Sequence, residues 1–315
     1  MNKHIPTIDD ICTAHKRIAP YINRTPVMSS GLINDITGAS LYFKCENLQK
    51  AGTFKFRGAT NSVLQITVEQ ALLGVATHSS GNHAGALALA AGSRGIPAYI
   101  VMPENSPEIK KNAVAGYGAQ ITFCKPTLQA REEGLKIVVE KTGATFIHPY
   151  DNSRIITGQG TAAKELLEEI PGLDIIMTPV GGGGLLSGTS ITAKAMKPEI
   201  QVIAAEPEGA ADAWRSFTSG TLQPSVNPKT ICDGLLTSLS ELTFSIIRNN
   251  VDDIITVSDT IILKALKLVW ERMKIIIEPS SAVVLAAILT DPRRFKGKSI
   301  GLIISGGNVD PETYL

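Results

Sequence analysis

The sequence predicts an α/β protein with two open, mostly parallel twisted sheets flanked by helices, in which a small lobe is inserted into a large lobe. Three observations support this prediction. Short apolar runs alternate with helical patterns between residues 74 and 150. A second alternation of the same kind follows after residue 150. The chain has 315 residues, of which 43% are hydrophobic, so it is long enough to form two compact units.

The first alternation predicts a small domain over residues 74–150. A helix is expected to begin with Ser106 as its N-cap and Pro107 at its first position. The order strand, helix, strand, helix, strand, helix, strand implies a parallel sheet covered by helices. The expected strands are 74–80, 97–103, 119–125 and 144–150, and the expected helices are 81–95, 106–118 and 128–143.

The second alternation predicts a large domain built from residues 1–73 and 151–315. The apolar run 41–46 near the N-terminus is expected to join its sheet. The other expected strands are 174–180, 201–207, 253–259 and 299–307, and the expected helices are 161–170, 187–197, 260–274 and 280–291. Ligands of such open sheets bind outside the carboxyl ends of the strands, so the strand-to-helix turns are where chemistry is expected.

Composition and charge narrow the class of protein. The formal net charge is +1 and no Lys/Arg run is present, which argues against nucleic-acid binding. The N-terminal segment lacks the apolar core of a secretory signal, and the apolar stretches are too short to cross a bilayer. The four cysteines are scattered, without metal-ligand spacing, as expected of reduced thiols. We therefore expect a cytoplasmic protein with no membrane partner.

A lysine between two phenylalanines, in "GTFKFRG", is the first candidate for chemistry. Phe54 and Phe56 would give Lys55 an apolar environment, which lowers the pKa of an amine. A neutral lysine amine is a nucleophile that can form a Schiff base. The alternative is a surface lysine on a strand edge or at a helix start, with the aromatic rings turned inward.

Four consecutive glycines in "PVGGGGLLSG" follow an apolar strand and open a helix. Their uncovered N–H groups, together with the helix N-terminus, can converge on an anion. The segment lacks the Lys-Ser/Thr pair of a P-loop and the spaced glycines of a dinucleotide fingerprint, so a monophosphate fits best. A flexible loop is the alternative.

Two further turns carry polar side chains at strand ends. In "THSSGNHAG", Ser79, Ser80, Asn82 and His83 surround a glycine and could hold a substrate carboxylate, or could serve only to cap the helix. In "ISGGNVD", Ser305 ends a strand before two glycines that allow another group to approach closely. A tight turn with a structural serine is the alternative there.

Acidic residues in "EPEGAAD" form a weaker candidate. Glu206, Asp212 and the carbonyl of Ala210 could supply oxygen ligands to a hard cation such as Mg²⁺ or Ca²⁺. Solvated acidic residues are the alternative. The segment "GQGTAA" is similar to a dinucleotide fingerprint, but no clear strand precedes it, so we discount it.

Taken together, five segments resemble the threonine dehydratase/serine racemase family of pyridoxal-phosphate (PLP) enzymes, of the tryptophan-synthase-β (fold type II) class. The segments are "KCENLQKAGTFKFRGA", "THSSGNHAGALA", "TGQGTAAKELL", "PVGGGGLLSG" and "ISGGNVD". The resemblance covers nearly the whole chain. Cysteine synthases usually have a threonine-rich form of the "SSGNH" loop, so the chain is more similar to the dehydratases and racemases. No C-terminal regulatory domain is expected.

The resemblance implies roles for the residues around the cofactor. Lys55 would hold it covalently, Phe54 would lie against its ring, and Asn82 would bond the phenolic oxygen. Ser305 would face the pyridine nitrogen, and Gly234 would leave room for the other face of the ring. The glycines that would cradle the phosphate are Gly181, Gly182, Gly183 and Gly184.

The resemblance also implies a substrate and a cation site. Ser79, Ser80, Asn82 and His83 would line the substrate carboxylate, with Ser80 as the second proton donor in a racemase. The cation, Mg²⁺ or else Ca²⁺ or Mn²⁺, would bind the serine racemase site, which corresponds here to Glu206, Ala210 and Asp212. ATP activates some racemases, and a homodimer is implied.

The expected reaction is elimination of the β-hydroxyl of an amino acid to give a 2-oxo acid and ammonia, racemisation of serine, or both. L-serine, L-threonine, D-serine and 3-hydroxyaspartate are all open as substrates. Arg131 could bind a second carboxylate and select 3-hydroxyaspartate, or could be a solvated helix residue. Two other classes stay open: a β-replacement enzyme of the cysteine synthase type, and a binding module without activity.

Overall fold

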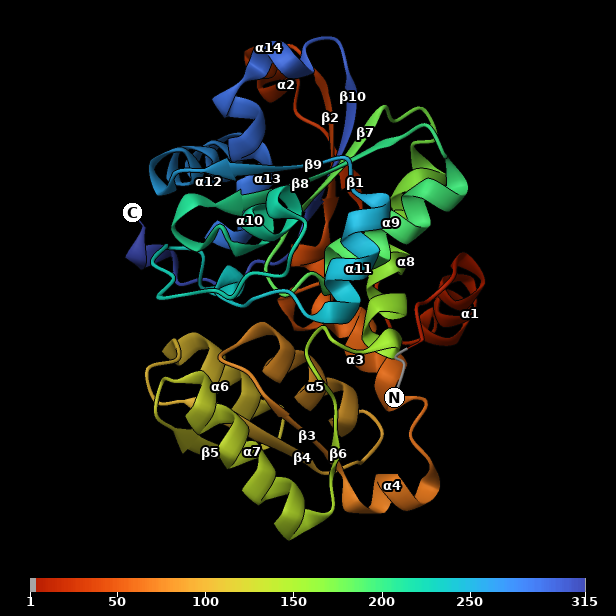
Figure 1. Cartoon of the computed structure of the whole chain (residues 1–315), viewed down its shortest axis with the longest axis vertical. Helices are drawn as coiled ribbons and strands as arrows, with labels where there is room; N and C mark the ends of the chain where they lie inside the picture. The colour runs from red at the N-terminus through yellow and green to blue at the C-terminus, as the bar shows by residue number, and fades with distance from the viewer. Residues whose placement is uncertain (1–3, 315) are drawn as a thin grey trace.

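The computed structural model describes residues 4–314 and contains two sheets, each flanked by helices (Figure 1). The six-stranded sheet lies in the upper part of the figure and defines the large lobe. The four-stranded sheet lies in the lower part and defines the small lobe. The α/β class and the two mostly parallel sheets are therefore confirmed, whereas the domain boundaries stay a prediction.

The large sheet has the strand order β1-β2-β10-β7-β8-β9. Only the β1–β2 pair is antiparallel; every other pair is parallel. Strand β2, from the N-terminal part of the chain, pairs with β10 near the C-terminus, so both ends of the chain build this sheet as expected. The bounds are β1 Val27–Met28, β2 Ser40–Cys45, β7 Ile175–Pro179, β8 Gln201–Pro207, β9 Asp253–Val257 and β10 Ser299–Ile304.

The small sheet has the order β5-β4-β3-β6 and is parallel throughout. All four residues of β3 are buried, as are all five of β7, because helices cover both faces of each sheet. The bounds are β3 Val75–His78, β4 Ala98–Pro103, β5 Gln120–Cys124 and β6 Thr145–Phe146.

Helices divide the apolar core into layers on either side of the sheets. In the large lobe, α12 and α13 pack on one face, and α8, α9 and α11 pack on the other. In the small lobe, α3 and α5 cover one face and α7 covers the other. Helix α13 is apolar on every side and is buried along most of its length.

The bounds of the helices complete the description. The α-helices are α1 Ile8–Ile18, α2 Gly31–Thr37, α3 Lys55–Val63, α4 Val68–Leu73, α5 Asn82–Gly92, α6 Glu108–Gly116, α7 Leu128–Thr142, α8 Ser153–Glu169, α9 Gly184–Met196, α10 Asp212–Ser219, α11 Glu241–Asn250, α12 Asp259–Met273, α13 Pro279–Thr290 and α14 Pro292–Phe295. The 3₁₀ turns are η1 Glu46–Leu48, η2 Lys50–Gly52, η3 Glu208–Ala210, η4 Asp233–Leu235 and η5 Pro311–Thr313.

Two helix starts differ from the sequence predictions. Helix α6 begins at Glu108, so Ser106 is not its N-cap: Pro107 has an extended ψ of 136° and stands outside the helix. Among residues 4–314, the buried Ser106 hydroxyl has no hydrogen-bond partner. Helix α8 begins at Ser153, earlier than predicted, because the Asn152 side chain accepts hydrogen bonds from the first helical N–H groups. The "GQGTAA" segment lies inside α8, which agrees with discounting it.

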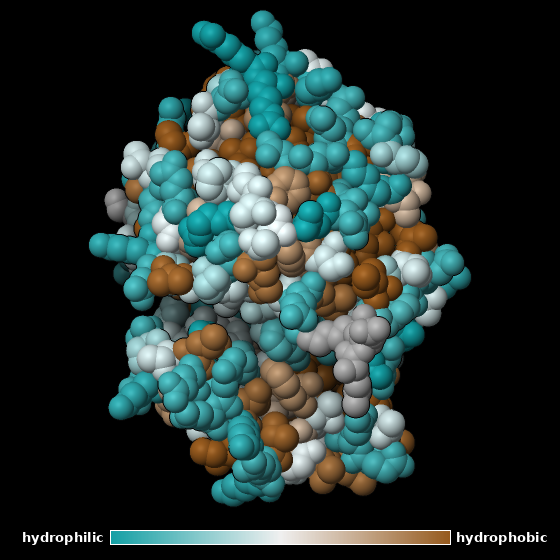
Figure 2. Space-filling view, in the orientation of Figure 1, coloured by the Kyte–Doolittle hydropathy of each residue, from teal (hydrophilic) through white to brown (hydrophobic). Residues whose placement is uncertain are grey.

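The molecular surface agrees with a water-exposed globule. The face in Figure 2 is mainly hydrophilic, with apolar side chains scattered over it, and it is hollowed between the two lobes. Among residues 4–314, no helix has both the length and the apolar character that crossing a membrane requires.

Candidate active site

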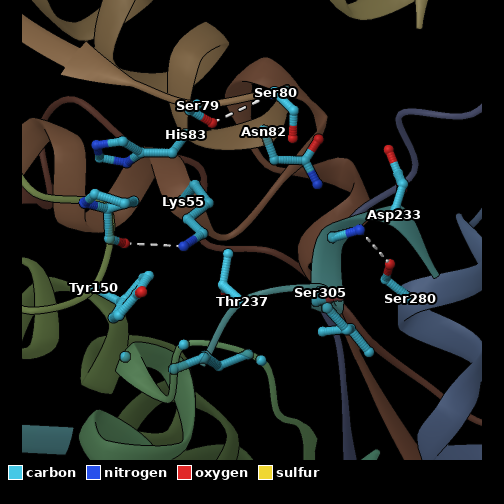
Figure 3. A pocket seen from close by; sticks show the side chains of 18 of the residues that line it. Lys55, Ser79, Ser80, Asn82, His83, Tyr150, Asp233, Thr237, Ser280 and Ser305 are labelled. Atoms are coloured by element: carbon cyan, nitrogen blue, oxygen red, sulfur yellow. Dashed lines mark hydrogen bonds between the residues drawn. The ribbon is translucent and has the colours of Figure 1, made fainter. Parts of the chain in front are cut away.

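A cavity between the lobes collects most of the residues that the sequence singled out (Figure 3). It lies at the carboxyl ends of β3, β7 and β10, where an open α/β sheet binds its ligand. The predicted site residues that line it are Phe54, Lys55, Ser79, Ser80, Asn82, His83, Arg131, Gly181, Gly182, Gly183, Gly184, Gly234 and Ser305.

Lys55 is the first residue of α3 and points into this cavity. Its Nζ donates a hydrogen bond of 2.9 Å to the carbonyl of Pro149 and lies 5.2 Å from the centre of the Phe54 ring. Burial lowers the pKa of the amine from 10.5 to about 8. Phe56 instead turns into the core of the small lobe. The apolar-environment interpretation of "FKF" therefore describes the local structure better than a surface lysine.

The tetraglycine turn, residues 181–184, connects β7 to α9 and is closely packed on two sides. A Cβ on Gly182 would lie 2.3 Å from Cδ1 of Tyr150, and one on Gly183 would lie 2.7 Å from Cδ2 of Leu239. Gly183 also has a φ of +83°, which a side chain would strain. The turn is therefore a fixed structure at a helix N-terminus, and its N–H groups suit an anion.

The turn between β3 and α5 supplies Ser79, Ser80 and Asn82 to the cavity. The N-cap position of α5 is Gly81, and no side chain caps the helix there. Ser79 Oγ accepts a 3.3 Å hydrogen bond from the N–H of Gly81. Uncapped N–H groups and hydroxyls at a helix N-terminus are suited to a carboxylate, so simple capping does not account for this cluster.

His83 lies in the same turn, but its ring is already engaged. Nε2 is 3.2 Å from the carbonyl of Ile147, and burial holds the pKa well below 6.5, so the ring is neutral. A carbonyl only accepts, so Nε2 carries the proton and Nδ1 is an acceptor. The ring therefore has no donor left for a carboxylate, and only the backbone N–H of His83 could serve one.

Ser305 directly follows β10 at the wall of the cavity and ties this strand end to the lysine segment. Its carbonyl accepts hydrogen bonds from the N–H of Phe54 at 2.9 Å and from Thr53 Oγ1 at 3.2 Å. Its hydroxyl lies 2.9 Å from that of Ser281. These bonds hold the start of α3 against the end of β10, so Lys55 and Ser305 keep a fixed relation.

A charge cluster that sequence reasoning missed bridges the two lobes beside the cavity, with Lys110 and Glu278 buried and the Asp233 side chain 38% exposed. Lys110, on α6, donates to Asp233 Oδ2 at 2.5 Å and to Glu278 Oε2 at 3.4 Å. Glu278 Oε1 also accepts a 2.6 Å bond from the Asn82 amide, whose oxygen accepts one from Asn308 at 3.0 Å. One signal was available: Glu278 follows three isoleucines and precedes an apolar helix, where a carboxylate needs partners.

Arg131, on α7, also reaches the cavity wall, together with His78 and Tyr150. Its Nε makes a 3.4 Å hydrogen bond to the Thr127 carbonyl. Within residues 4–314 its guanidinium forms no ion pair. Burial and the Arg131 charge lower the pKa of His78 to about 4, so this histidine beside the guanidinium is neutral.

The acidic candidates lie away from the cavity, at the end of β8 and the start of α10. Glu206 accepts 2.9 Å hydrogen bonds from the N–H groups of Ala213 and Trp214, and burial raises its pKa to about 8. Burial raises the pKa of Asp212 to about 6. Ala210 is buried beside them. Among the residues that the structure describes, no cluster of three or more His, Cys, Asp or Glu side chains is placed to hold a metal.

Fold and cavity together define a class: an α/β enzyme in which a desolvated lysine and a glycine turn at a helix N-terminus line one cavity between the lobes. Residues 18–306 match the family model described as "Pyridoxal-phosphate dependent enzyme". The chain therefore belongs to this family, as the sequence motifs predicted.

Individual relatives point to a narrower group of activities within this family. The chain is 54% identical to a serine racemase from Dictyostelium discoideum, covering 96% of this chain and 95% of that one. It is 52% identical to a beta-hydroxyaspartate dehydratase from Paracoccus denitrificans, covering 98% of each chain. The crystal structure of the Dictyostelium serine racemase matches with a TM-score of 0.92, covering 98% of this chain and 100% of that one.

Proposed function

We propose that this chain is a PLP-dependent ammonia-lyase for small β-hydroxy amino acids, and that it also racemises serine. The observation that carries the proposal is the Lys55 amine, whose pKa burial lowers to about 8, facing the tetraglycine turn across one cavity. At pH 7 about a tenth of such an amine is neutral, far more than for a lysine in water. Relatives described as serine racemase and L-threo-3-hydroxyaspartate ammonia-lyase support the same assignment.

The residues present fit PLP. The tetraglycine turn leaves a cradle that a Cβ would fill, and Lys55 is free of any carboxylate partner among the described residues. Phe54 and Gly234 line the cavity, and Ser305 offers a hydroxyl for the pyridine nitrogen. When bound, the cofactor supplies an electron sink for the bond broken at the α-carbon.

Protein groups then bind the substrate and move its protons. Ser79, Ser80 and the N–H groups at the start of α5 would hold the α-carboxylate. Lys55 would remove the α-proton. Ser80 would deliver a proton to the opposite face of the α-carbon during racemisation, a role that elimination does not require.

A second candidate substrate class is 3-hydroxyaspartate, which carries an additional carboxylate. The observation that favours it is Arg131, an unpaired guanidinium at the cavity wall. A guanidinium binds a carboxylate through two parallel hydrogen bonds, which selects a dicarboxylic substrate over serine or threonine.

Several further features belong to the proposal. A divalent cation, Mg²⁺, Ca²⁺ or Mn²⁺, would bind at Glu206, Asp212 and the Ala210 carbonyl. No group in the described part of the chain makes a hydrogen bond of normal geometry to the buried Asp212 carboxylate, although Ser225 lies near enough to lower its pKa somewhat. A homodimer and activation by ATP rest on resemblance to serine racemases alone, whereas a cytoplasmic location rests on the four scattered cysteines, which are typical of a reducing compartment.

The main test is turnover by the purified, PLP-loaded chain. L-serine, L-threonine and 3-hydroxyaspartate are each supplied with and without Mg²⁺ and ATP, and 2-oxo acid, ammonia and D-isomer are measured. Lys55→Ala should lose activity by about 100- to 10,000-fold, whereas the exposed Lys141→Ala should not. Ser80→Ala should suppress D-serine formation more than 2-oxo acid formation. Absence of 2-oxo acid with every substrate, or turnover only with sulfide, would refute the proposal.

The substrate class is tested with Arg131→Gln. We expect kcat/KM for 3-hydroxyaspartate to fall by about tenfold or more, since a charged hydrogen-bond pair is lost, while kcat/KM for L-serine changes little. Arg154→Gln, at an exposed arginine, is the control. Equal losses for both substrates would show that Arg131 does not read the second carboxylate.

A further inference from the structure

The segment that returns the chain from the small lobe to the large lobe, residues 147–152, forms one wall of the cavity. Three of its residues are tied to different parts of the site. The Ile147 carbonyl lies 3.2 Å from His83 Nε2, and the Pro149 carbonyl accepts from Lys55 Nζ at 2.9 Å. Asp151 Oδ1 accepts from Ser240 Oγ, at the start of α11, at 2.9 Å. This crossing segment therefore connects Lys55, the turn between β3 and α5, and the large lobe.

Within the crossing segment, the side chain of Tyr150 lies directly on the tetraglycine turn. A Cβ on Gly182 would be 2.3–2.5 Å from Cδ1, Cγ and Cε1 of the ring, so the ring covers the Gly182 Cα. A Cβ on Gly184 would be 3.0 Å from the Tyr150 Cβ. The opposite side of the turn is closed by Leu239 and Thr243, at 2.7 and 2.9 Å from a Cβ on Gly183. The turn is thus clamped between Tyr150 and this second wall.

The Tyr150 ring is itself held in place. The imidazole of His148 packs edge-on against it, with ring centres 4.6 Å apart. His148 Nδ1 accepts hydrogen bonds from the N–H groups of Tyr150, at 3.3 Å, and Asp151, at 2.9 Å. Within residues 4–314 the Tyr150 hydroxyl has no hydrogen-bond partner, so the contact with the turn is made by the flat ring and not by the hydroxyl.

We propose that Tyr150 is a positioning residue for the cofactor phosphate: its ring fixes the shape of the tetraglycine turn so that the N–H groups converge on the phosphate. This inference rests on the proposed function, because it takes PLP as the ligand. It adds a residue that the motifs did not indicate. The crossing segment would then support both parts of the cofactor site. Pro149 accepts a hydrogen bond from Lys55, and the adjacent Tyr150 packs on the tetraglycine turn.

The proposal predicts that loss of the Tyr150 ring weakens the binding of a ligand that carries the phosphate group more than the binding of one that lacks it. The full-length chain is freed of cofactor and titrated with PLP or with pyridoxal, which has the same ring and aldehyde but no phosphate. Tyr150→Ala should weaken PLP binding by about tenfold, as expected when a residue supporting a binding group is removed, and pyridoxal binding much less. Tyr150→Phe keeps the ring and should bind PLP like the wild type. Tyr99→Ala, at a half-buried tyrosine outside the cavity, is the control.

The comparison of ligands separates positioning from general stability. A pyridoxal affinity close to that of the wild type shows that the cavity of Tyr150→Ala is folded. If this variant does not fold, Tyr150→Leu takes its place, and it too should bind PLP more weakly while binding pyridoxal nearly as well as the wild type. Equal losses for the two ligands, an unaltered PLP affinity, or a loss in Tyr150→Phe as large as in Tyr150→Ala would each overturn the proposal. If the wild type binds pyridoxal as tightly as PLP, the chain has no phosphate site, and the proposed function fails. This outcome differs from failure of the Tyr150 proposal because it is seen in the unmutated chain.

Discussion

At the scale of single residues, the fold buries the side-chain amine of Lys55 where its protonated form is poorly solvated. Lys55 has the Phe54 ring and a backbone carbonyl beside it, and no carboxylate among residues 4–314 pairs with it. Desolvation is the cause of its lowered pKa. The same burial that makes the amine a better nucleophile therefore destabilises the cofactor-free fold at neutral pH.

This burial predicts a pH-dependent stability. The folded pKa of about 8 lies below the unfolded value of 10.5, so between these pH values the unfolded chain binds more protons and stability rises with pH. In cofactor-free protein, Lys55→Met should raise the free energy of unfolding below pH 8. The ceiling is about 3 kcal/mol, and less is expected because the side chain is partly exposed. Urea unfolding at pH 7 and pH 10 checks this; a difference from wild type that does not shrink toward pH 10 contradicts it.

At the scale of elements, helix α3 presents Lys55 because its other side is anchored by buried charges. Arg57 is fully buried and donates to Glu46 at 2.7 and 2.8 Å and to Glu165 at 2.8 Å. Lys44 adds a 2.7 Å bond to Glu165. Helix α3 is thereby tied to the segment after β2 and to α8, at a position two residues beyond Lys55.

Removal of the buried Arg57 guanidinium should lower the stability of the folded chain. Arg57→Met would leave the Glu46 carboxylate buried without a cation, and we expect the free energy of unfolding to fall by about 3–5 kcal/mol. Arg24→Met is the control, because Arg24 is exposed and lies 3.5 Å from Glu168, a pair worth about 0–1 kcal/mol. Urea denaturation of both variants measures the difference. Similar small effects in the two would show that the buried cluster does not anchor α3.

The junction of β8 and α10 leads to a prediction about Mg²⁺. Burial makes the Glu206 and Asp212 carboxylates costly to ionise, and a bound divalent cation would compensate their charge. A cation that binds only the folded chain stabilises that chain. Mg²⁺ should therefore raise the melting temperature of the wild type, and Asp212→Asn should lose that increase. Asp259→Asn, at the start of α12, is the control. A Mg²⁺ effect that persists in Asp212→Asn would place the cation elsewhere.

At the scale of the whole molecule, the two lobes meet through buried charges as well as through the chain. Lys110 belongs to the small lobe, whereas Asp233 and Glu278 belong to the large lobe. Two carboxylates balance one ammonium, which holds the pKa of Lys110 above its ordinary value despite burial. The bridge lies at the cavity and joins the lobe that carries the turn between β3 and α5 to the lobe that carries the tetraglycine turn.

The bridge predicts coupling between the lobes. Lys110→Met should lower the free energy of unfolding by about 3 kcal/mol and speed amide hydrogen exchange in β3 and β4 more than in β7 and β8. The neighbouring Lys111→Met is the control, since Lys111 forms its ion pair with Glu108 of α6, at 2.7 Å, and its ammonium otherwise lies 5.7 Å from the Phe123 ring centre in the same lobe. Hydrogen exchange that rises equally in both sheets would indicate general destabilisation instead of loss of the bridge.

The motifs located most of the candidate site because its parts are short and local. A strand end, a run of glycines and the first turn of a helix are set by neighbouring residues, so Lys55, the tetraglycine turn and Ser305 could be placed on their turns in advance. Their roles toward PLP stay predictions. The single-residue error at Ser106 is likewise local: the proline at 107 stands before the helix because its ψ is extended.

The sequence by itself determined the class of fold, the strand-to-helix turns and the family, since these depend on periodicity and short patterns. Only the tertiary structure decided which distant groups meet: Lys110 with Glu278, Arg57 with Glu165, Tyr150 with Gly182. The members of the first two pairs stand more than 100 positions apart. Such contacts are decided by how the helices and sheets pack, because a buried charge needs an opposite partner in space and places no constraint on where that partner stands in the chain.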